Sequence, residues 1–138
     1  MRATPKLEQG PLRGVHIVVV EDHDDSRFIV EASLRYCGGL VTAVRSASEA
    51  LTVVRKVTPD IVLADIAMPF HDGIWLLDQL RARQQATGRY FPVVALTASI
   101  SRPMAHAFDE ILLKPCPVEK LCEVILRLTA DRRRDDEK

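Results

Sequence analysis

Charged and hydroxyl side chains follow four apolar runs of this sequence, each at the point where a run ends. Glu21 and Asp22 follow HIVVV (16–20), Asp65 follows IVLA (61–64), Thr97 follows PVVAL (92–96), and Lys114 follows ILL (111–113). Two carboxylates about 4 Å apart repel by about 4 kcal/mol at an effective dielectric constant of about 20, so three acids that converge require a cation. Carboxylates are oxygen ligands that suit Mg²⁺. This residue set therefore predicts a magnesium site.

The same residues also suit phosphoryl transfer. An aspartate can act as a nucleophile and form an aspartyl-phosphate. Asp65 follows the central apolar run and is the candidate nucleophile. Charge on a transferred phosphoryl group spreads over its equatorial oxygens. We expect Lys114 to neutralise one of these oxygens and Thr97 to donate a hydrogen bond to another.

Strands and helices that alternate along the chain must position these side chains. Apolar, β-branched runs predict strands at 16–20, 40–45, 61–64, 92–96 and 111–113. Helical periodicity predicts helices at 26–36, 47–57, 74–83 and 118–128. Ser46 and Glu49 match a capping box at the start of the second helix. This order predicts an α/β fold, a doubly wound five-stranded parallel sheet, in which ligands bind beyond the carboxyl ends of the strands.

In the first of these helices, the apolar residues fall on one helical face. They are Phe28, Ile29, Ala32 and Tyr36. This pattern is typical of an amphipathic helix.

Composition narrows the classes of protein further. The 138 residues suit one domain, and 19 basic residues balance 19 acidic ones, so we expect no nucleic-acid partner. No apolar run reaches the length of a membrane span, and the amino terminus lacks a secretory signal, which predicts a cytoplasmic protein with no membrane contact. We expect a flexible leader at 1–14, one domain at 15–129 and a charged, frayed tail at 130–138. The three cysteines lack metal-site spacing and are expected to be reduced.

Four motifs, in this order, resemble the receiver domain of two-component response regulators. They are VVVEDHDDSR, VLADIAMPFHDG, VVALTAS and LLKP, and the resemblance covers about residues 15–128. It implies the flavodoxin-like receiver fold, with Asp65 as phosphoacceptor and Mg²⁺ or Mn²⁺ as cofactor. The metal ligands it implies are Asp22, Asp65 and the backbone carbonyl of Ala67, with Glu21 in the acidic pocket acting through water. Thr97 and Lys114 take the switch and phosphoryl-contact roles, and Pro115 follows a cis peptide bond.

Two features depart from the family pattern. Only residues 98–113 separate Thr97 from Lys114, so we expect a shortened fourth helix and a poorly helical segment from Ser99 to Asp109. Ile111 stands where the family often has an aromatic residue that rotates on phosphorylation. A phosphorylation-independent interaction module on the same fold is therefore the alternative function.

Other phosphate-binding α/β classes fit less well. The sequence has neither a GxxxxGK[ST] loop nor a GxGxxG fingerprint. Ala67 occupies the position where an aspartyl phosphatase would carry its second acid. The resemblance implies a stand-alone regulator or relay that is not an enzyme in the usual sense. Its partners would be a sensor histidine kinase or phosphotransfer protein and an unknown downstream protein, with a homodimer also possible.

Overall fold

A five-stranded parallel sheet forms the centre of the computed structural model, which describes residues 10–98 and 107–137, with the backbone alone for 131–137. The strands are β1 (His16–Val20), β2 (Leu40–Val44), β3 (Ile61–Ala64), β4 (Val93–Thr97) and β5 (Glu110–Leu113). They lie in the order β2-β1-β3-β4-β5, and all neighbours are parallel. The predicted α/β fold is thus confirmed.

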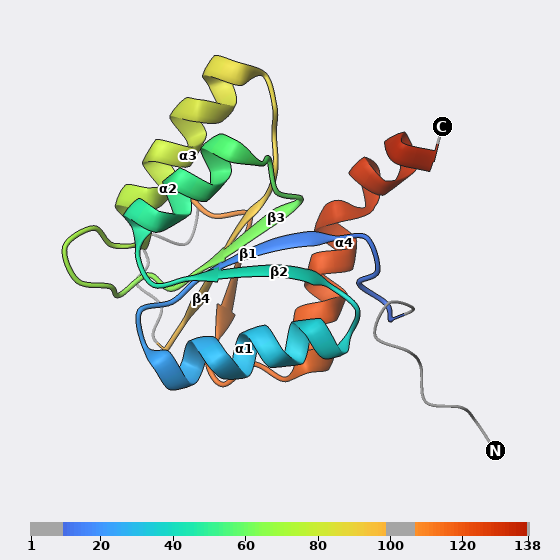
Figure 1. Cartoon of the computed structure of the whole chain (residues 1–138), viewed down its shortest axis with the longest axis horizontal. Helices are drawn as coiled ribbons and strands as arrows, with labels where there is room; N and C mark the ends of the chain where they lie inside the picture. The colour runs from blue at the N-terminus through green and yellow to red at the C-terminus, as the bar shows by residue number, and fades with distance from the viewer. Residues whose placement is uncertain (1–9, 99–106, 138) are drawn as a thin grey trace.

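Helices cover both faces of this sheet (Figure 1). They are α1 (Asp24–Tyr36), α2 (Ala47–Lys56), α3 (Gly73–Thr87) and α4 (Val118–Glu137). Alternate residues of β1 point to opposite faces, as the pleat requires. Val18 and Val20 pack with α2 and α3, whereas Ile17 and Val19 pack with α1 and α4. The central strands are therefore buried on both sides, which explains their continuously apolar sequence.

Two expected boundaries shift in the structure. The last helix does not end near residue 128 but continues through the charged segment to Glu137. Alanine and arginine in this segment favour helix. At the other end, Leu12 is fully buried and its N–H donates to the Cys37 carbonyl at 2.9 Å. The packed domain therefore begins before residue 15, because the turn at 10–14 covers the end of α1.

The expected short fourth helix falls mainly on residues 99–106, which lie outside the described part of the chain. Residues 107–109 are a turn and bend that lead into β5. Within the described ranges, no helix is long and apolar enough to cross a membrane.

The apolar face predicted for α1 does not pack on the sheet. Phe28, Ile29 and Tyr36 are 71%, 62% and 66% exposed, and Leu34 is the fully buried residue of the helix. Leu34 packs with partly buried Val30 against the α1 and α4 side of the sheet. Periodicity alone identified an apolar stripe but not the stripe that the sheet covers.

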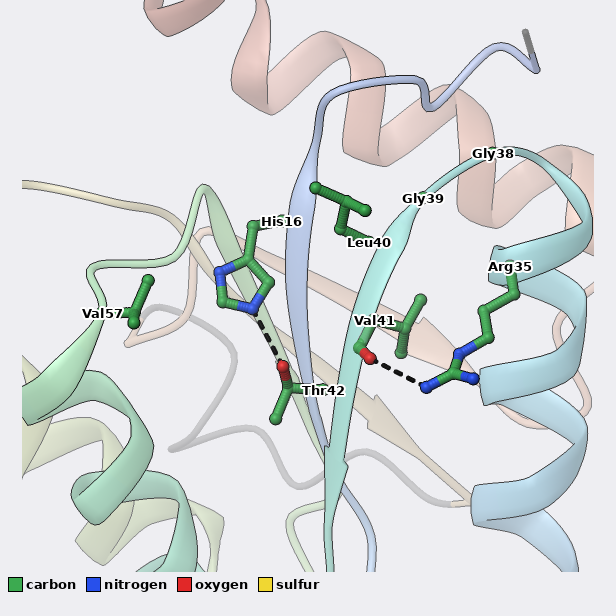
Figure 2. A pocket seen from close by; sticks show the side chains of 8 residues that line it. All are labelled: His16, Arg35, Gly38, Gly39, Leu40, Val41, Thr42 and Val57. Atoms are coloured by element: carbon green, nitrogen blue, oxygen red, sulfur yellow. Dashed lines mark hydrogen bonds between the residues drawn. The ribbon is translucent and has the colours of Figure 1, made fainter. Parts of the chain in front are cut away.

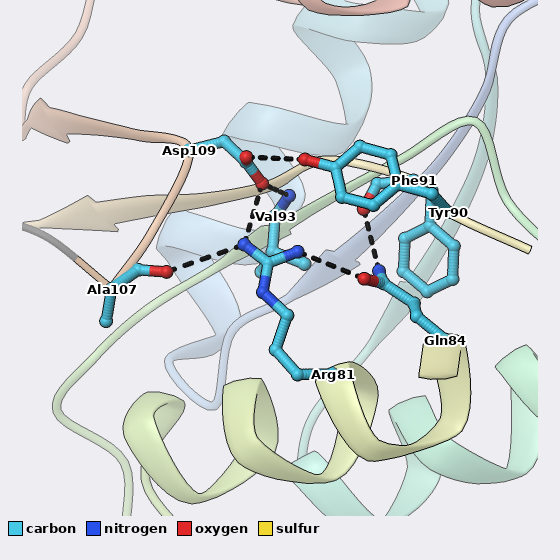
Figure 3. Close-up of polar contacts among 7 residues, drawn as sticks. All are labelled: Arg81, Gln84, Tyr90, Phe91, Val93, Ala107 and Asp109. Atoms are coloured by element: carbon cyan, nitrogen blue, oxygen red, sulfur yellow. Dashed lines mark hydrogen bonds and ion pairs between the residues drawn. The ribbon is translucent and has the colours of Figure 1, made fainter. Parts of the chain in front are cut away.

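A polar cluster around Asp109 ties the amino ends of β4 and β5 to α3 (Figure 3). The Asp109 carboxylate accepts hydrogen bonds from the Tyr90 hydroxyl at 2.6 Å, the Val93 N–H at 2.7 Å and the Arg81 guanidinium at 2.9 Å. Arg81 also donates to the carbonyl of Ala107 at 3.4 Å. This cluster anchors the chain as it enters β5.

Candidate functional site

The carboxyl ends of β1 and β3 place two acids side by side. The hydrogen-bond ladder of the sheet continues one residue past each strand. The Glu21 N–H donates to the Val44 carbonyl at 3.0 Å, and the Asp65 N–H donates to the Val20 carbonyl at 2.9 Å. The backbones of Glu21 and Asp65 are therefore held by the sheet itself, on neighbouring strands.

Three carboxylates meet at this end of the sheet. Glu21, Asp22 and Asp65 each offer an oxygen, and these oxygens all lie within 4.8 Å of one another. Glu21 is 3% exposed, and its Oε2 has no hydrogen-bond partner among the described residues. A buried carboxylate oxygen without a donor is costly. The cluster thus has the donor chemistry of a site for a hard divalent cation.

Lys114 enters the cluster from the end of β5. Its ammonium is hydrogen-bonded to the Glu21 carboxylate and lies 3.6 Å from Asp65 Oδ2. Burial raises the pKa of Glu21, the neighbouring Asp65 carboxylate raises it further, and Lys114 opposes both effects. One ammonium among three carboxylates leaves an excess of negative charge at this point.

Thr97 lies next to Lys114 across the β4–β5 ladder. The Lys114 N–H donates to the Thr97 carbonyl at 2.7 Å, and Thr97 is 3% exposed. The following Lys114–Pro115 peptide bond is cis, the isomer implied by the resemblance. The four strand ends therefore bring together the acids, the hydroxyl-bearing residue and the lysine that the sequence singled out.

The loop from β3 to α3 fixes the far side of Asp65. The Ala67 N–H donates to Asp65 Oδ1 at 3.3 Å. Gly73 begins α3 against this backbone, and a Cβ at position 73 would meet the Asp65 carbonyl oxygen at 2.5 Å. Asp72 caps the helix by accepting the Trp75 N–H at 2.9 Å. Glycine at this helix start therefore allows α3 to pack directly against Asp65.

Sequence reasoning missed a contact made by Arg27. Its guanidinium donates to the backbone carbonyl of Glu21 at 3.0 Å and pairs with Asp24 at 2.6 Å. The three-residue spacing from Asp24 to Arg27 is typical of an ion pair on a helix surface. Nothing in that spacing indicates that the same arginine reaches back to the loop that carries the acids.

A second hollow lies at the opposite end of β1 and β2 (Figure 2). It has a volume of about 770 Å³, and its lining includes His16, Arg35 and Thr42. His16 Nε2 and Thr42 Oγ1 are 3.0 Å apart and satisfy each other there. This hollow contains none of the strand-end acids, so the candidate site is the carboxylate cluster.

A doubly wound α/β sheet with acids, a threonine and a lysine at its carboxyl end belongs to the class of α/β domains whose ligand sites lie at the carboxyl ends of the strands. Residues 17–126 match the response regulator receiver domain family, and the chain belongs to this family.

Comparisons with known proteins agree with this assignment. The chain is 29% identical over 127 residues to the sensory/regulatory protein RpfC of Xanthomonas campestris pv. campestris, covering 88% of this chain but 18% of RpfC. It is 31% identical over 119 residues to an uncharacterised 14.6 kDa protein of Leptolyngbya boryana, covering 83% of this chain and 89% of that protein. The structure is similar to the receiver domain of the sensor histidine kinase PA1611 from Pseudomonas aeruginosa PAO1, which has magnesium coordinated in its active-site cleft. That match has a TM-score of 0.77 and 30% identity, and it covers 85% of this chain and 98% of that one.

Proposed function

We propose that this domain accepts a phosphoryl group on Asp65 in a reaction that depends on Mg²⁺ or Mn²⁺, and so acts as a regulator or relay in cytoplasmic two-component signalling. One observation carries the proposal: three carboxylates lie within 4.8 Å of one another beside Lys114. Buried Glu21 adds to the unbalanced negative charge, because its Oε2 meets no hydrogen-bond donor in the described ranges of the chain. The magnesium in the PA1611 receiver domain supports the same interpretation.

The residues divide the work as follows. Asp22, Asp65 and the Ala67 carbonyl would hold the cation, and Glu21 would contact it through water. When bound, the cation supplies positive charge for the phosphoryl oxygens. A carboxylate oxygen of Asp65 attacks phosphorus and forms a new O–P bond, while the bond from phosphorus to the donor breaks and the donor keeps its electron pair. The Lys114 ammonium, which lies 3.6 Å from Asp65 Oδ2, would form an ion pair with one phosphoryl oxygen. The Thr97 hydroxyl would donate a hydrogen bond to another phosphoryl oxygen.

The donor would be a sensor histidine kinase or a histidine phosphotransfer protein, and an unknown downstream protein would respond to the modified form. The domain assists its own phosphorylation and hydrolysis without serving as an enzyme in the usual sense. A phosphorylation-independent interaction module is the second candidate. Ile111, a partly buried core residue, favours it because it cannot supply a rotating aromatic ring.

Intact-mass measurement tests the proposal directly. The wild-type protein is incubated with Mg²⁺ and acetyl phosphate, and we expect the mass of one phosphoryl group to be added. Asp65→Asn should abolish the gain, and chelation of the metal should greatly reduce it. Asp78→Asn, at an exposed aspartate of α3, is the matched control and should be modified like wild type. An unmodified wild type at saturating donor would instead support the interaction module.

A further inference from the structure

Arg27 holds the segment that carries the acidic pair. This residue lies in the first turns of α1, and one guanidinium nitrogen donates to the Glu21 carbonyl at 3.0 Å. The other nitrogen pairs with Asp24 at 2.6 Å. Because Asp22 lies between these two anchor points, the guanidinium bridges the chain on both sides of a proposed metal ligand.

Helix capping adds little support to the segment between Glu21 and Asp24. His23 is the N-cap of α1, and its side chain makes no capping hydrogen bond. A helix start usually gains rigidity from such a bond. Here the Arg27 side chain, which is 16% exposed, provides a fixed point instead. The planar guanidinium can serve a carbonyl and a carboxylate together, which a lysine ammonium does with less directional control.

Charge and position predict opposite effects for this arginine. As a cation near an acidic cluster, Arg27 would repel a divalent ion and weaken its binding. As a clamp, it would hold Asp22 and Glu21 in place and strengthen binding. The ion pair with Asp24 offsets much of the cationic charge, so we expect the clamp to dominate.

We infer that Arg27 is a positioning residue for the divalent-cation site, acting through the Glu21 carbonyl and Asp24 to orient the acidic pair. This inference rests on the proposed function and adds to it a residue that touches neither the cation nor the phosphoryl group. Groups that orient metal ligands in this indirect way typically change metal affinity by about 10- to 100-fold when they are lost.

Arg35 offers a matched control on the same helix. Its guanidinium donates to the Val41 carbonyl at 3.2 Å (Figure 2). It also pairs with Glu31 at 2.7 Å, which gives the same combination of a backbone carbonyl and an acid on the preceding turn. The carbonyl that it binds belongs to β2 near its amino end, away from the carboxylate cluster. Loss of Arg35 therefore removes similar contacts without touching the site.

The experiment compares Arg27→Gln, Arg27→Lys and Arg35→Gln with wild type by calorimetric titration with Mg²⁺. We expect the dissociation constant to rise about tenfold in Arg27→Gln, by a smaller factor in Arg27→Lys, and not at all in Arg35→Gln. The Mg²⁺ concentration that gives half-maximal phosphorylation by acetyl phosphate should rise in parallel, while the extent at saturating Mg²⁺ stays at the wild-type level. General unfolding would lower that final extent, so this split separates positioning from structural damage.

Each outcome has a clear meaning. An unchanged or lower dissociation constant in Arg27→Gln would overturn the positioning role while leaving the proposed function intact. If Arg27→Gln does not fold, wild-type affinity in Arg27→Lys would overturn it, and weakened binding in Arg27→Lys would support it. Absence of Mg²⁺ binding by wild type would overturn the proposed function and, with it, this inference.

Discussion

Carboxylates at the two ends of the sheet have opposite environments. At the amino ends, Asp109 accepts the N–H of Val93, the first residue of neighbouring β4, and Asp60 accepts the N–H of His16, the first residue of β1, at 2.7 Å. At the carboxyl ends, Glu21 is buried with an oxygen that finds no donor in the described part of the chain. The same chemical group is thus satisfied at one end and left short of donors at the other.

The pKa values of Asp109 and Glu21 are shifted in opposite directions. Burial alone would raise the pKa of Asp109, but hydrogen bonds from Tyr90, the Val93 N–H and Arg81 bring it below the usual value. Burial raises the pKa of Glu21, and Asp65 adds to the effect. We therefore expect Asp109 to stabilise the fold, and we expect the three crowded carboxylates at the carboxyl ends to lower its stability in the absence of a cation.

The largest expected change in unfolding free energy comes from Asp109, at the amino ends of the strands. Asp109→Ala removes the acceptor of Tyr90, Arg81 and the Val93 N–H, and unpaired donors of this kind cost about 2–3 kcal/mol. We expect the free energy of unfolding in urea to fall by that amount. Asp78→Ala, at an exposed position of α3, should change it little. A loss no greater than that of Asp78→Ala would show that the Asp109 cluster is not a structural anchor.

The next largest effect is stabilisation by Mg²⁺ at the carboxyl ends of the strands. A cation that binds only the folded state raises the free energy of unfolding by about 1.4 kcal/mol at a tenfold excess over its dissociation constant. We therefore expect Mg²⁺ to raise the melting temperature of wild type. Asp22→Ala should remove most of the rise, whereas Asp60→Ala, at the other end of the sheet, should keep it. An Asp60→Ala variant that loses the response while Asp22→Ala retains it would reverse the comparison.

A smaller change is expected when one charge leaves the crowded cluster. Asp65→Asn keeps the side-chain shape but removes repulsion with two carboxylates, at the expense of one attraction to Lys114 at 3.6 Å. We expect the metal-free protein to gain about 1 kcal/mol of unfolding free energy. Urea unfolding in a chelating buffer measures the gain. A loss of stability would mean that the ammonium already balances the cluster without a cation.

These contrasts also show what the sequence could predict. The strands and the residues at their carboxyl ends were read from continuous apolar runs, because a parallel sheet brings those ends together whatever the loops do. The helix cap was equally local: the Glu49 N–H donates to the Ser46 hydroxyl at 3.1 Å as expected, although the Glu49 carboxylate accepts the N–H of Arg45, one residue before the N-cap, also at 3.1 Å. Local patterns of this kind fix the elements and the acidic cluster.

Contacts between distant segments cannot be predicted from such local patterns. The Asp109 cluster joins α3, the segment before β4 and the turn before β5, and no motif links Arg81, Tyr90 and Asp109. The buried stripe of α1 depends on how the sheet meets the helix, so Leu34 could not be distinguished from Phe28 by periodicity. The orientation of Arg27 toward Glu21 likewise follows from tertiary packing.

The smallest expected effect concerns the pH dependence of the satisfied acid. Because the pKa of Asp109 is lowered on folding, its contribution to stability is present above the usual aspartate value of about 3.9 and is lost as pH falls through the lower, folded value. The difference in unfolding free energy between wild type and Asp109→Asn should therefore stay nearly constant from about pH 6 to about 4.5 and shrink as the pH is lowered further to about 3.

Tyr90→Phe measures how much one hydrogen-bond donor contributes to the lowered pKa of Asp109. The variant removes one of the hydrogen bonds that lower the pKa of Asp109, so part of the pH dependence should go with it. Urea unfolding of wild type, Tyr90→Phe and Asp109→Asn across this range gives the three slopes. If the difference between wild type and Asp109→Asn stays constant with pH, Asp109 is not held in its charged form by its donors. The two ends of the sheet would then differ in geometry but not in the ionisation of their acids.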